Sequence, residues 1–278
     1  MNADDRTGRL GAYLRARRNL VTPEEAGIPA GAHRRVPGLR REEVAMLAGI
    51  SADYYLRLER GRDRNPSPQV LTGLARVLRL DEVEQQYLLD LAAPAHRSRP
   101  RRRTERVPAR LHHLLAAVGT PAFIEGRTFD VLASNPLARA LSPRLRPGEN
   151  RLRSLLLDPE ERAFQADWEA ATEGFVAAFR RSIGEDVEDA RVVELVGELS
   201  LASARFRTLW ARHDVRRLVG GTAVVNHPEV GELRLHRDKF PVENVTLVMY
   251  YAEPGSPSSQ KLTLLQSLAA DATDAVNN

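Results

Sequence analysis

The sequence predicts two domains: an all-helical N-terminal domain of five short helices, and a C-terminal α+β domain with an antiparallel sheet. The chain has 278 residues, about twice the usual length of one domain. Before residue 93 apolar residues recur at helical spacing, whereas later segments alternate as strands do and end in turn residues. The predicted parts are a domain over 1–93, a linker over 94–108 and a domain over 109–278.

The five N-terminal helices are separated by recognisable stop and start signals. Gly49 follows an apolar stripe, where a left-handed residue ends a helix at little cost. Ser51 is a good N-cap for the next helix, and Gly61 stops that helix in turn. The first helix is expected at residues 8–20, the second from Arg40 to Ala48 and the third at 52–60. The fourth follows a capped start at Asn65-Pro66-Ser67-Pro68 and runs to Leu78, and the fifth begins at Leu80-Asp81 and reaches Leu91.

The linker is rich in proline and arginine. Five arginines lie between residues 99 and 106 and would repel one another in a packed core.

Beyond the linker, a hairpin is expected over 123–133, helices over 134–141, 159–183, 189–201 and around Phe206–Trp210, then strands within 218–226, 230–240 and 242–255. A further strand or short helix is expected at 261–269. Helices between a first hairpin and three last strands indicate an α+β domain.

Charge is distributed unevenly along the chain. The net charge is +4, but residues 1–106 hold 21 Arg and 14 acidic residues, whereas the remainder holds 20 basic and 23 acidic residues. The first part is therefore +7 and the rest −3, which suits a polyanionic partner for the first part. A merely solvated basic face is the simpler alternative.

The pair of helices around Gly49 has helix-turn-helix spacing. Val44, Tyr55 and Leu58 can bury between the helices, which leaves Ala52, Asp53, Tyr54 and Arg57 on the outer side of the second helix. A helix of this size fits a DNA major groove. An ordinary helical hairpin that packs against another domain has the same pattern, but the basic residues that flank the second helix favour DNA.

Residues 39–62, L-R-R-E-E-V-A-x-L-A-G-I-S-x-D-Y-Y-x-R-L-E-x-G-R, resemble the helix-turn-helix of Xre (lambda-repressor-like) transcription regulators. The Tyr54-Tyr55 pair and the preceding Arg34-Arg35-Val36-Pro37-Gly38 resemble the MmyB-like subgroup. Further matches to that subgroup are Asn135-Pro136-Leu137-Ala138, Phe206-Arg207-x-Leu209-Trp210-Ala211, His213-Asp214-Val215 and Ala252-Glu253-Pro254-Gly255-Ser256-Pro257. The resemblance spans nearly the whole chain.

This resemblance implies an N-terminal five-helix, lambda-repressor-like DNA-binding domain and a C-terminal PAS-like domain that binds a small fatty or otherwise apolar ligand. Arg41 corresponds to a polar DNA-contacting residue at the start of the second helix, and Arg57 to a base-facing position. The expected DNA-binding residues are Arg40, Arg41, Ser51, Ala52, Asp53, Tyr54, Arg57, Arg62 and Arg64. For Asp53, an alternative role is to complement the helix dipole.

A stripe of aromatic residues marks the C-terminal domain. It is either plain core or, as the resemblance suggests, the wall of a ligand pocket. The expected pocket residues are Phe123, Val131, Trp168, Phe175, Phe179, Phe206, Trp210, Leu235 and Met249. One departure from the subgroup is Ser134, where its pattern leads us to expect Trp; a pocket lined by that position would be larger or differently shaped.

Other chemistry finds little support in the sequence. There is no cysteine, phosphate-binding loop or nucleophile elbow, and the adjacent His112 and His113 would diverge on a helix, so no metal, cofactor or catalytic residue is expected. The rival hypotheses are an enzyme that uses His213, Asp214 and His227, and an adaptor whose helical domain binds protein.

The expected protein is a dimeric transcription regulator. One small helix-turn-helix buries too little surface for high specificity, so a homodimer would read two half-sites of double-stranded DNA about 34 Å apart, or a multiple of that. The N-terminus lacks the apolar region of a signal peptide, and no membrane span is evident, so a cytoplasmic location is expected.

Overall fold

The computed structural model describes residues 3–29, 34, 36–63, 65–93, 105–184, 187–218 and 220–277. It divides into two compact units. Unit 1 comprises Met1–Arg101, Gly184–Asp189 and Thr208–Arg217, and unit 2 comprises Arg102–Ile183, Ala190–Arg207 and Leu218–Asn278. Most of the expected linker lies outside the described residues, so the boundaries at 93 and 108 stay predictions.

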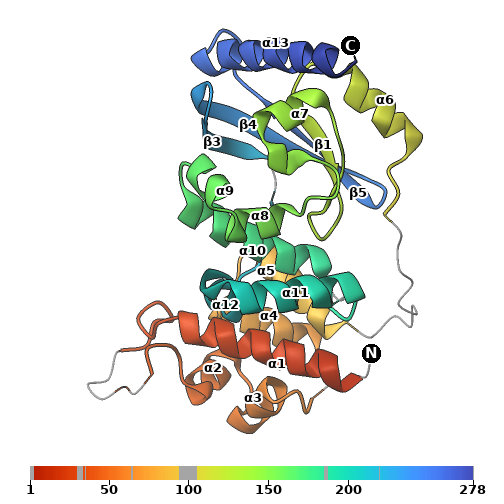
Figure 1. The fold of residues 1–278 in the computed structure, drawn as a ribbon. Helices are drawn as coiled ribbons and strands as arrows, with labels where there is room; N and C mark the ends of the chain where they lie inside the picture. Colours follow the sequence, from red (N-terminus) through yellow and green to blue (C-terminus); the bar gives the residue numbers. More distant parts are fainter. Residues whose placement is uncertain are drawn as a thin grey trace. The chain divides into compact units, whose positions relative to one another are not determined.

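The predicted N-terminal helices are present in unit 1 (Figure 1). They are α1 (Ala3–Leu20), α2 (Arg41–Ala48), α3 (Ala52–Glu59), α4 (Pro68–Val77) and α5 (Glu82–Ala92). Gly49 and Gly61 adopt left-handed backbone angles, with φ of 69° and 64°, where α2 and α3 end. The Ser51 hydroxyl accepts a bond of 3.1 Å from the amide of Tyr54 and caps α3. The local signals in the sequence therefore place the turn correctly.

The core of unit 1 holds α3 tightly against α1 and α2. Tyr55 and Leu58 on α3 pack with Val44 on α2, and all three are fully buried. Gly11 on α1 permits the closest approach, because a Cβ atom there would lie 2.3 Å from the carbonyl oxygen of Glu59. Val215, from the later segment of unit 1, joins the same cluster. The fully buried residues of α3 lie on its inner side, and the half-buried Tyr54 also packs against this cluster.

Unit 2 is built on a five-stranded antiparallel sheet with the order β2-β1-β5-β4-β3. The strands are β1 (Ala122–Glu125), β2 (Val131–Ser134), β3 (Gly221–His227), β4 (Gly231–Val242) and β5 (Val245–Tyr251). The first hairpin joins the last three strands through β1 and β5, with Phe123 opposite Val248. The predicted antiparallel sheet is confirmed.

Helices contact both faces of this sheet. On one face α7 (Pro136–Leu141) and α13 (Pro257–Asn277) contribute Leu137, Leu141 and Leu265 to a core with Phe123 and Leu235. On the other face α6 (Ala109–Ala117) contributes Leu111 and Leu115. The remaining elements are the 3-10 turn η1 (Pro143–Leu145) and α8 (Arg151–Leu157), α9 (Pro159–Phe164), α10 (Trp168–Ile183), α11 (Ala190–Ala202) and α12 (Ala204–Ala211), whose last residues belong to unit 1.

Two expectations for the C-terminal region need correction, and one helix there was not expected. The single helix expected over 159–183 is broken between α9 and α10, because Gln165 bridges to Val225 on β3 and Asp167 caps a new start by accepting from the amide of Ala170. The segment expected at 261–269 is part of the much longer α13. Helix α8 was not predicted; Asn150 caps it and anchors it to the Thr128 carbonyl.

Candidate functional site

The outer side of α3 carries the residues expected to meet DNA. Ala52, Asp53 and Arg57 are exposed and Tyr54 is half-buried, whereas Tyr55 is fully buried. This is the helix register expected from the sequence. The cap residue Ser51 is exposed as well, although its hydroxyl is occupied by the helix.

Arg57 is held in place by three neighbours. Its Nη1 donates to Asp53 Oδ2 at 2.5 Å, one turn earlier on the same helix. Its Nε lies 3.8 Å from Asp63 Oδ2, in the loop that follows Gly61. The guanidinium also lies over the Tyr54 ring, 5.3 Å from its centre. The side chain of Arg57 is nevertheless 44% exposed, so it remains accessible to a partner.

A buried carboxylate anchors the second expected arginine. Glu59 accepts from Arg18 Nε at 2.6 Å and from Arg41 Nε at 2.7 Å, and its side chain is only 2% exposed. Burial favours neutral Glu59, but the two arginines outweigh burial and hold the pKa of this carboxyl below its usual value. Arg41 is thereby fixed at one end while its side chain stays 44% exposed.

Further arginines surround this anchor. Arg40 and Arg62 are exposed, as expected, and Arg64 lies outside the described residues. A hollow beside Glu59 is lined by Gly8, Arg15, Arg41, Glu59, Arg60 and Arg62. Arg15 and Arg60 were not among the expected contacts; the basic composition of this half was the only signal for them. The hollow is basic enough to receive a phosphate.

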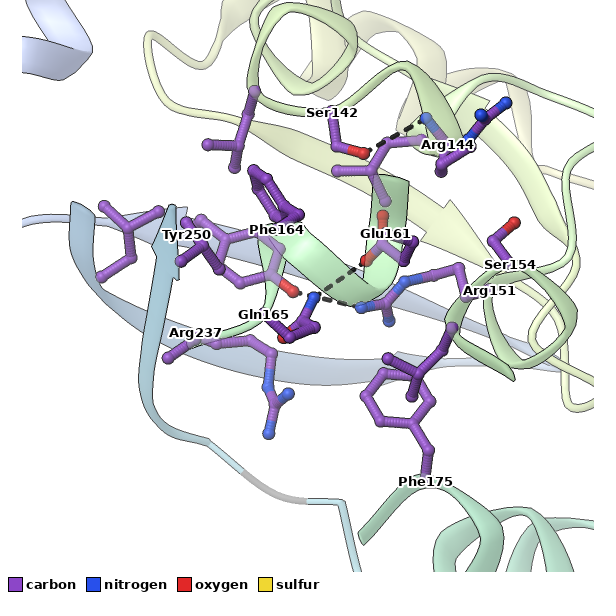
Figure 2. A pocket seen from close by; sticks show the side chains of 16 residues that line it. Ser142, Arg144, Arg151, Ser154, Glu161, Phe164, Gln165, Phe175, Arg237 and Tyr250 are labelled. Carbon is purple, nitrogen blue, oxygen red and sulfur yellow. Dashed lines mark hydrogen bonds between the residues drawn. The ribbon is translucent and has the colours of Figure 1, made fainter. Parts of the chain in front are cut away.

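Unit 2 contains a cavity between the sheet and the helices α8 to α10 (Figure 2). It is partly open to solvent. The apolar part of the wall includes Leu155, Phe164, Phe175, Val225 and Leu235. The polar part of the wall consists of Ser142, Arg144, Arg151, Ser154, Glu161, Gln165, Arg237 and Tyr250. The wall of the cavity therefore combines an apolar and a polar part.

The polar wall is organised by a second buried carboxylate. Glu125 accepts from Arg151 Nη1 at 2.9 Å and from Lys239, and its side chain is 2% exposed. Burial works against ionisation of Glu125, yet the two cations hold its pKa below the usual value. The other Nη of Arg151 donates to the Tyr250 hydroxyl at 3.1 Å, and its guanidinium lies between the rings of Phe123 and Phe175.

Two more charged groups face the cavity. Burial raises the pKa of Glu161, which accepts a bond of 2.8 Å from the Gln165 amide. Arg237 lies on β4 opposite Tyr250, and its Nε is buried without a hydrogen-bond partner among the described residues. Sequence reasoning missed both. The alternation of β4 could have found Arg237, because every second residue from Leu233 and Leu235 faces inward.

The expected pocket residues are dispersed. Phe175 and Leu235 line the cavity, whereas Phe123 and Val131 lie in the adjoining core and Phe179 and Phe206 are fully buried. Trp168 donates its ring N–H to the Leu155 carbonyl at 2.7 Å. Met249 packs with the α6 cluster, and Trp210 belongs to unit 1. Ser134 is also not part of the cavity wall.

Asp214 and His227, two of the residues of the enzyme hypothesis, form ion pairs and hydrogen bonds within the protein. Asp214 pairs with Arg17 at 3.1 Å and with Arg212 at 2.8 Å. The His227 Nδ1 accepts from the amide of Glu229, so its Nε2 donates to the Ala140 carbonyl at 3.0 Å. His213 has a left-handed φ of 56°. The contacts of Asp214 and His227 therefore stabilise the fold around them.

Two family profiles match this architecture. Residues 9–88 match a helix-turn-helix domain, and residues 107–265 match the MmyB-like transcription regulator ligand binding domain, which covers more than half of the chain. The chain belongs to the MmyB-like transcription regulators. It is thus a DNA-binding transcription regulator with a ligand-binding domain. A search of curated proteins found no match. None of the helices in the described part of the chain is both long and apolar enough to span a bilayer.

Proposed function

We propose that this MmyB-like regulator binds its operator as a homodimer through the outer side of α3, and that a small ligand in the cavity of unit 2 modulates the affinity. The observation that carries the proposal is the division of α3 into a buried side and an exposed side. Tyr55 and Leu58 fix the helix from within, while Asp53 and Arg57 stay accessible. Such a rigid, half-exposed helix is suited to a major groove.

The arginines of unit 1 divide into two roles. Arg57 projects from the last turn of α3, and its guanidinium can form a fork with guanine O6 and N7. Arg40, Arg41 and Arg62 lie at the start of α2 and after α3, where they can hold phosphates. Arg64 is assigned to the same phosphate-binding group from its place in the sequence, and Ala52 and Tyr54 to apolar contact with bases.

The ligand is inferred from the wall of the cavity. Its apolar part, with Phe164, Phe175 and Leu235, suits a fatty or otherwise apolar body, and the polar part suits one polar group. Control of DNA binding requires that the ligand bind the DNA-competent and DNA-incompetent states with different affinities. Native mass spectrometry of the purified protein tests the ligand, and a bound apolar metabolite is the expected result.

The DNA-binding proposal is tested with full-length protein and a library of duplexes. The wild-type protein should select a site with two related halves and bind it with 2:1 stoichiometry. Arg57→Ala should weaken binding to that site roughly 5- to 150-fold, which corresponds to about 1–3 kcal/mol, and relax selection at one base of each half. Arg62→Ala should weaken binding to all sequences alike.

Controls distinguish this proposal from the two rivals. Arg110→Ala removes an equally basic surface group of unit 2, 62% exposed and paired with Glu243, and should leave DNA binding unchanged. Affinity should fall with salt with a log–log slope of about −5 for about six phosphate contacts, unlike that of a protein-binding adaptor. Turnover of a metabolite that His213→Ala abolishes would support the enzyme hypothesis instead.

A further inference from the structure

We propose that Asp53 and Asp63 are specificity-determining positioning residues: they hold the Arg57 guanidinium so that it reads a base and does not bind phosphates indiscriminately. This inference rests on the proposed function, in which α3 meets DNA. It assigns to Asp53 an action through Arg57 and not through a base, and it adds Asp63, which lies outside α3.

The two carboxylates approach Arg57 from different elements. Asp53 is in the first turn of α3 and accepts from Nη1 at 2.5 Å. Asp63 follows the left-handed Gly61 and reaches Nε at 3.8 Å. With the Tyr54 ring at 5.3 Å, three groups define the position of one surface arginine. The rest of the guanidinium is left for a partner.

Stability does not account for this convergence. Exposed ion pairs contribute little to folding, and the Asp53 side chain is 75% exposed. The Asp63 side chain is 27% exposed, but its oxygen lies 3.8 Å from Arg57 Nε, too far for a hydrogen bond. Asp53 would also complement the dipole at the start of α3, but this explanation does not extend to Asp63, which lies beyond the end of the helix. Within the described part of the chain, Arg57 is a cation that both carboxylates approach.

The two carboxylates make Arg57 favour a neutral base edge over a negatively charged phosphate. A free surface arginine is attracted to any phosphate, and this attraction is independent of sequence. Two carboxylates beside Arg57 repel a phosphate but leave a neutral acceptor pair, such as guanine O6 and N7, free to bind. Holding the side chain in advance also lowers the entropy lost when it docks. Non-specific affinity is reduced and selectivity is gained.

The test compares Asp53→Asn, Asp63→Asn and the double variant with wild-type protein in the full chain. Affinities are measured for the selected site, for variants at the base that Arg57 reads, and for an unrelated duplex. The double variant should bind the unrelated duplex several-fold more tightly, and its discrimination at that base should fall by roughly fivefold or more. In an Arg57→Ala background the same changes should leave base discrimination unaltered.

Glu42→Gln is the matched control, because Glu42 is an exposed acidic residue in the first turn of α2. It should raise affinity for all duplexes alike and leave discrimination unchanged. Unaltered discrimination in the double aspartate variant would overturn the inference. So would an Asp53→Asn effect that persists without Arg57, since Asp53 would then contact a base itself. If wild-type protein selects no sequence, the proposed function itself fails.

Discussion

In each unit of the molecule a buried carboxylate lies between two cations, but the two clusters differ in how far their side chains are exposed to water. In unit 1, Glu59 lies between Arg18 and Arg41, and the Arg41 side chain is 44% exposed. In unit 2, Glu125 lies between Arg151 and Lys239, whose side chains are 10% and 9% exposed. The cluster of unit 1 is therefore partly exposed to water and is called the half-open cluster. The cluster of unit 2 is buried and is called the closed cluster.

The difference corresponds to what each cluster can present to a partner. A half-open cluster fixes one end of a surface cation and leaves the other end for a phosphate. A closed cluster has no such free end, and it meets the cavity only through Arg151, which lines the wall. Buried charges must be paired to be tolerated, so the closed cluster depends more strongly on its carboxylate. This dependence can be measured.

The largest effect is expected from Glu125→Gln. The substitution leaves Arg151 and Lys239 buried without their shared anion, and loss of one partner from a buried ion pair costs about 3–5 kcal/mol. Hydrogen exchange in β1 and β5, measured along a urea titration of the full chain, reports the loss for unit 2. Glu243→Gln, whose partner Arg110 is 62% exposed, should change stability by less than about 0.5 kcal/mol. Equal losses in both variants would contradict the comparison.

A smaller loss is expected from Glu59→Gln, roughly 2–4 kcal/mol in the free energy of unfolding of unit 1. Arg41 can turn to water, and Arg18 retains its bond of 2.8 Å to the Leu39 carbonyl. The measurement is hydrogen exchange in α1 and α3. A loss as large as that of Glu125→Gln would mean that the exposure of Arg41 to water does not reduce the cost of removing its anionic partner. DNA affinity should also fall, because Arg41 loses its anchor.

Neither cluster could be predicted from the sequence, although the surrounding elements could. Gly49, Ser51 and Gly61 act within one turn of themselves, so the limits of α2 and α3 follow from local chemistry. Glu59 and Arg18 are 41 positions apart, and Glu125 and Lys239 are 114 apart. Their pairing depends on how helices and strands pack, and this is not encoded in any short pattern.

The lining of the cavity also depends on long-range packing that local sequence patterns do not predict. Phe175 and Phe179 of the aromatic stripe in α10 were both expected to line a pocket, and only Phe175 of these two lines the cavity, because helical spacing alone does not tell which aromatic side chains reach a cavity. The break between α9 and α10 likewise depends on β3, some sixty residues later. Strand alternation in β4, in contrast, predicts Arg237 and Lys239 on the inward face with Leu235, and Arg237 is part of the polar wall of the cavity.

Alkaline pH should separate the two units by the sign of the effect. Burial lowers the pKa of Lys239 to about 8 from an ordinary value of 10.5. Between these values the unfolded chain binds more protons than the folded one, so the stability of unit 2 should rise with pH, by at most about 1.4 kcal/mol per pH unit. Hydrogen-exchange stabilities at pH 8.5 and 9.5 test this, and Lys239→Met should remove the slope.

Unit 1 should not share this rise. Its cluster contains only arginines as cations, which stay protonated throughout this range. Burial raises the pKa of Tyr13 and of Tyr55 well above the ordinary value of 10, so their contribution to stability is present below pH 10 and is lost as pH rises further. Stability of unit 1 should therefore be flat to pH 9.5 and then fall. A rise in unit 1 would contradict the assignment of the effect to Lys239.

The smallest effect on stability is expected from Arg41→Lys, within about 0.5 kcal/mol, because the charge beside Glu59 is kept at a partly exposed site.

The effect of Arg41→Lys on DNA binding should be larger. Nε of Arg41 carries the bond to Glu59, so its two Nη groups are the ones available to a phosphate. A lysine has a single ammonium group and cannot hold both partners in the same geometry. Binding to all duplexes should weaken about threefold without a change in base selection, a fold-change that filter binding at fixed salt resolves. Unchanged affinity would mean that Arg41 acts as an ordinary surface charge, and that the half-open cluster serves the fold of unit 1 alone.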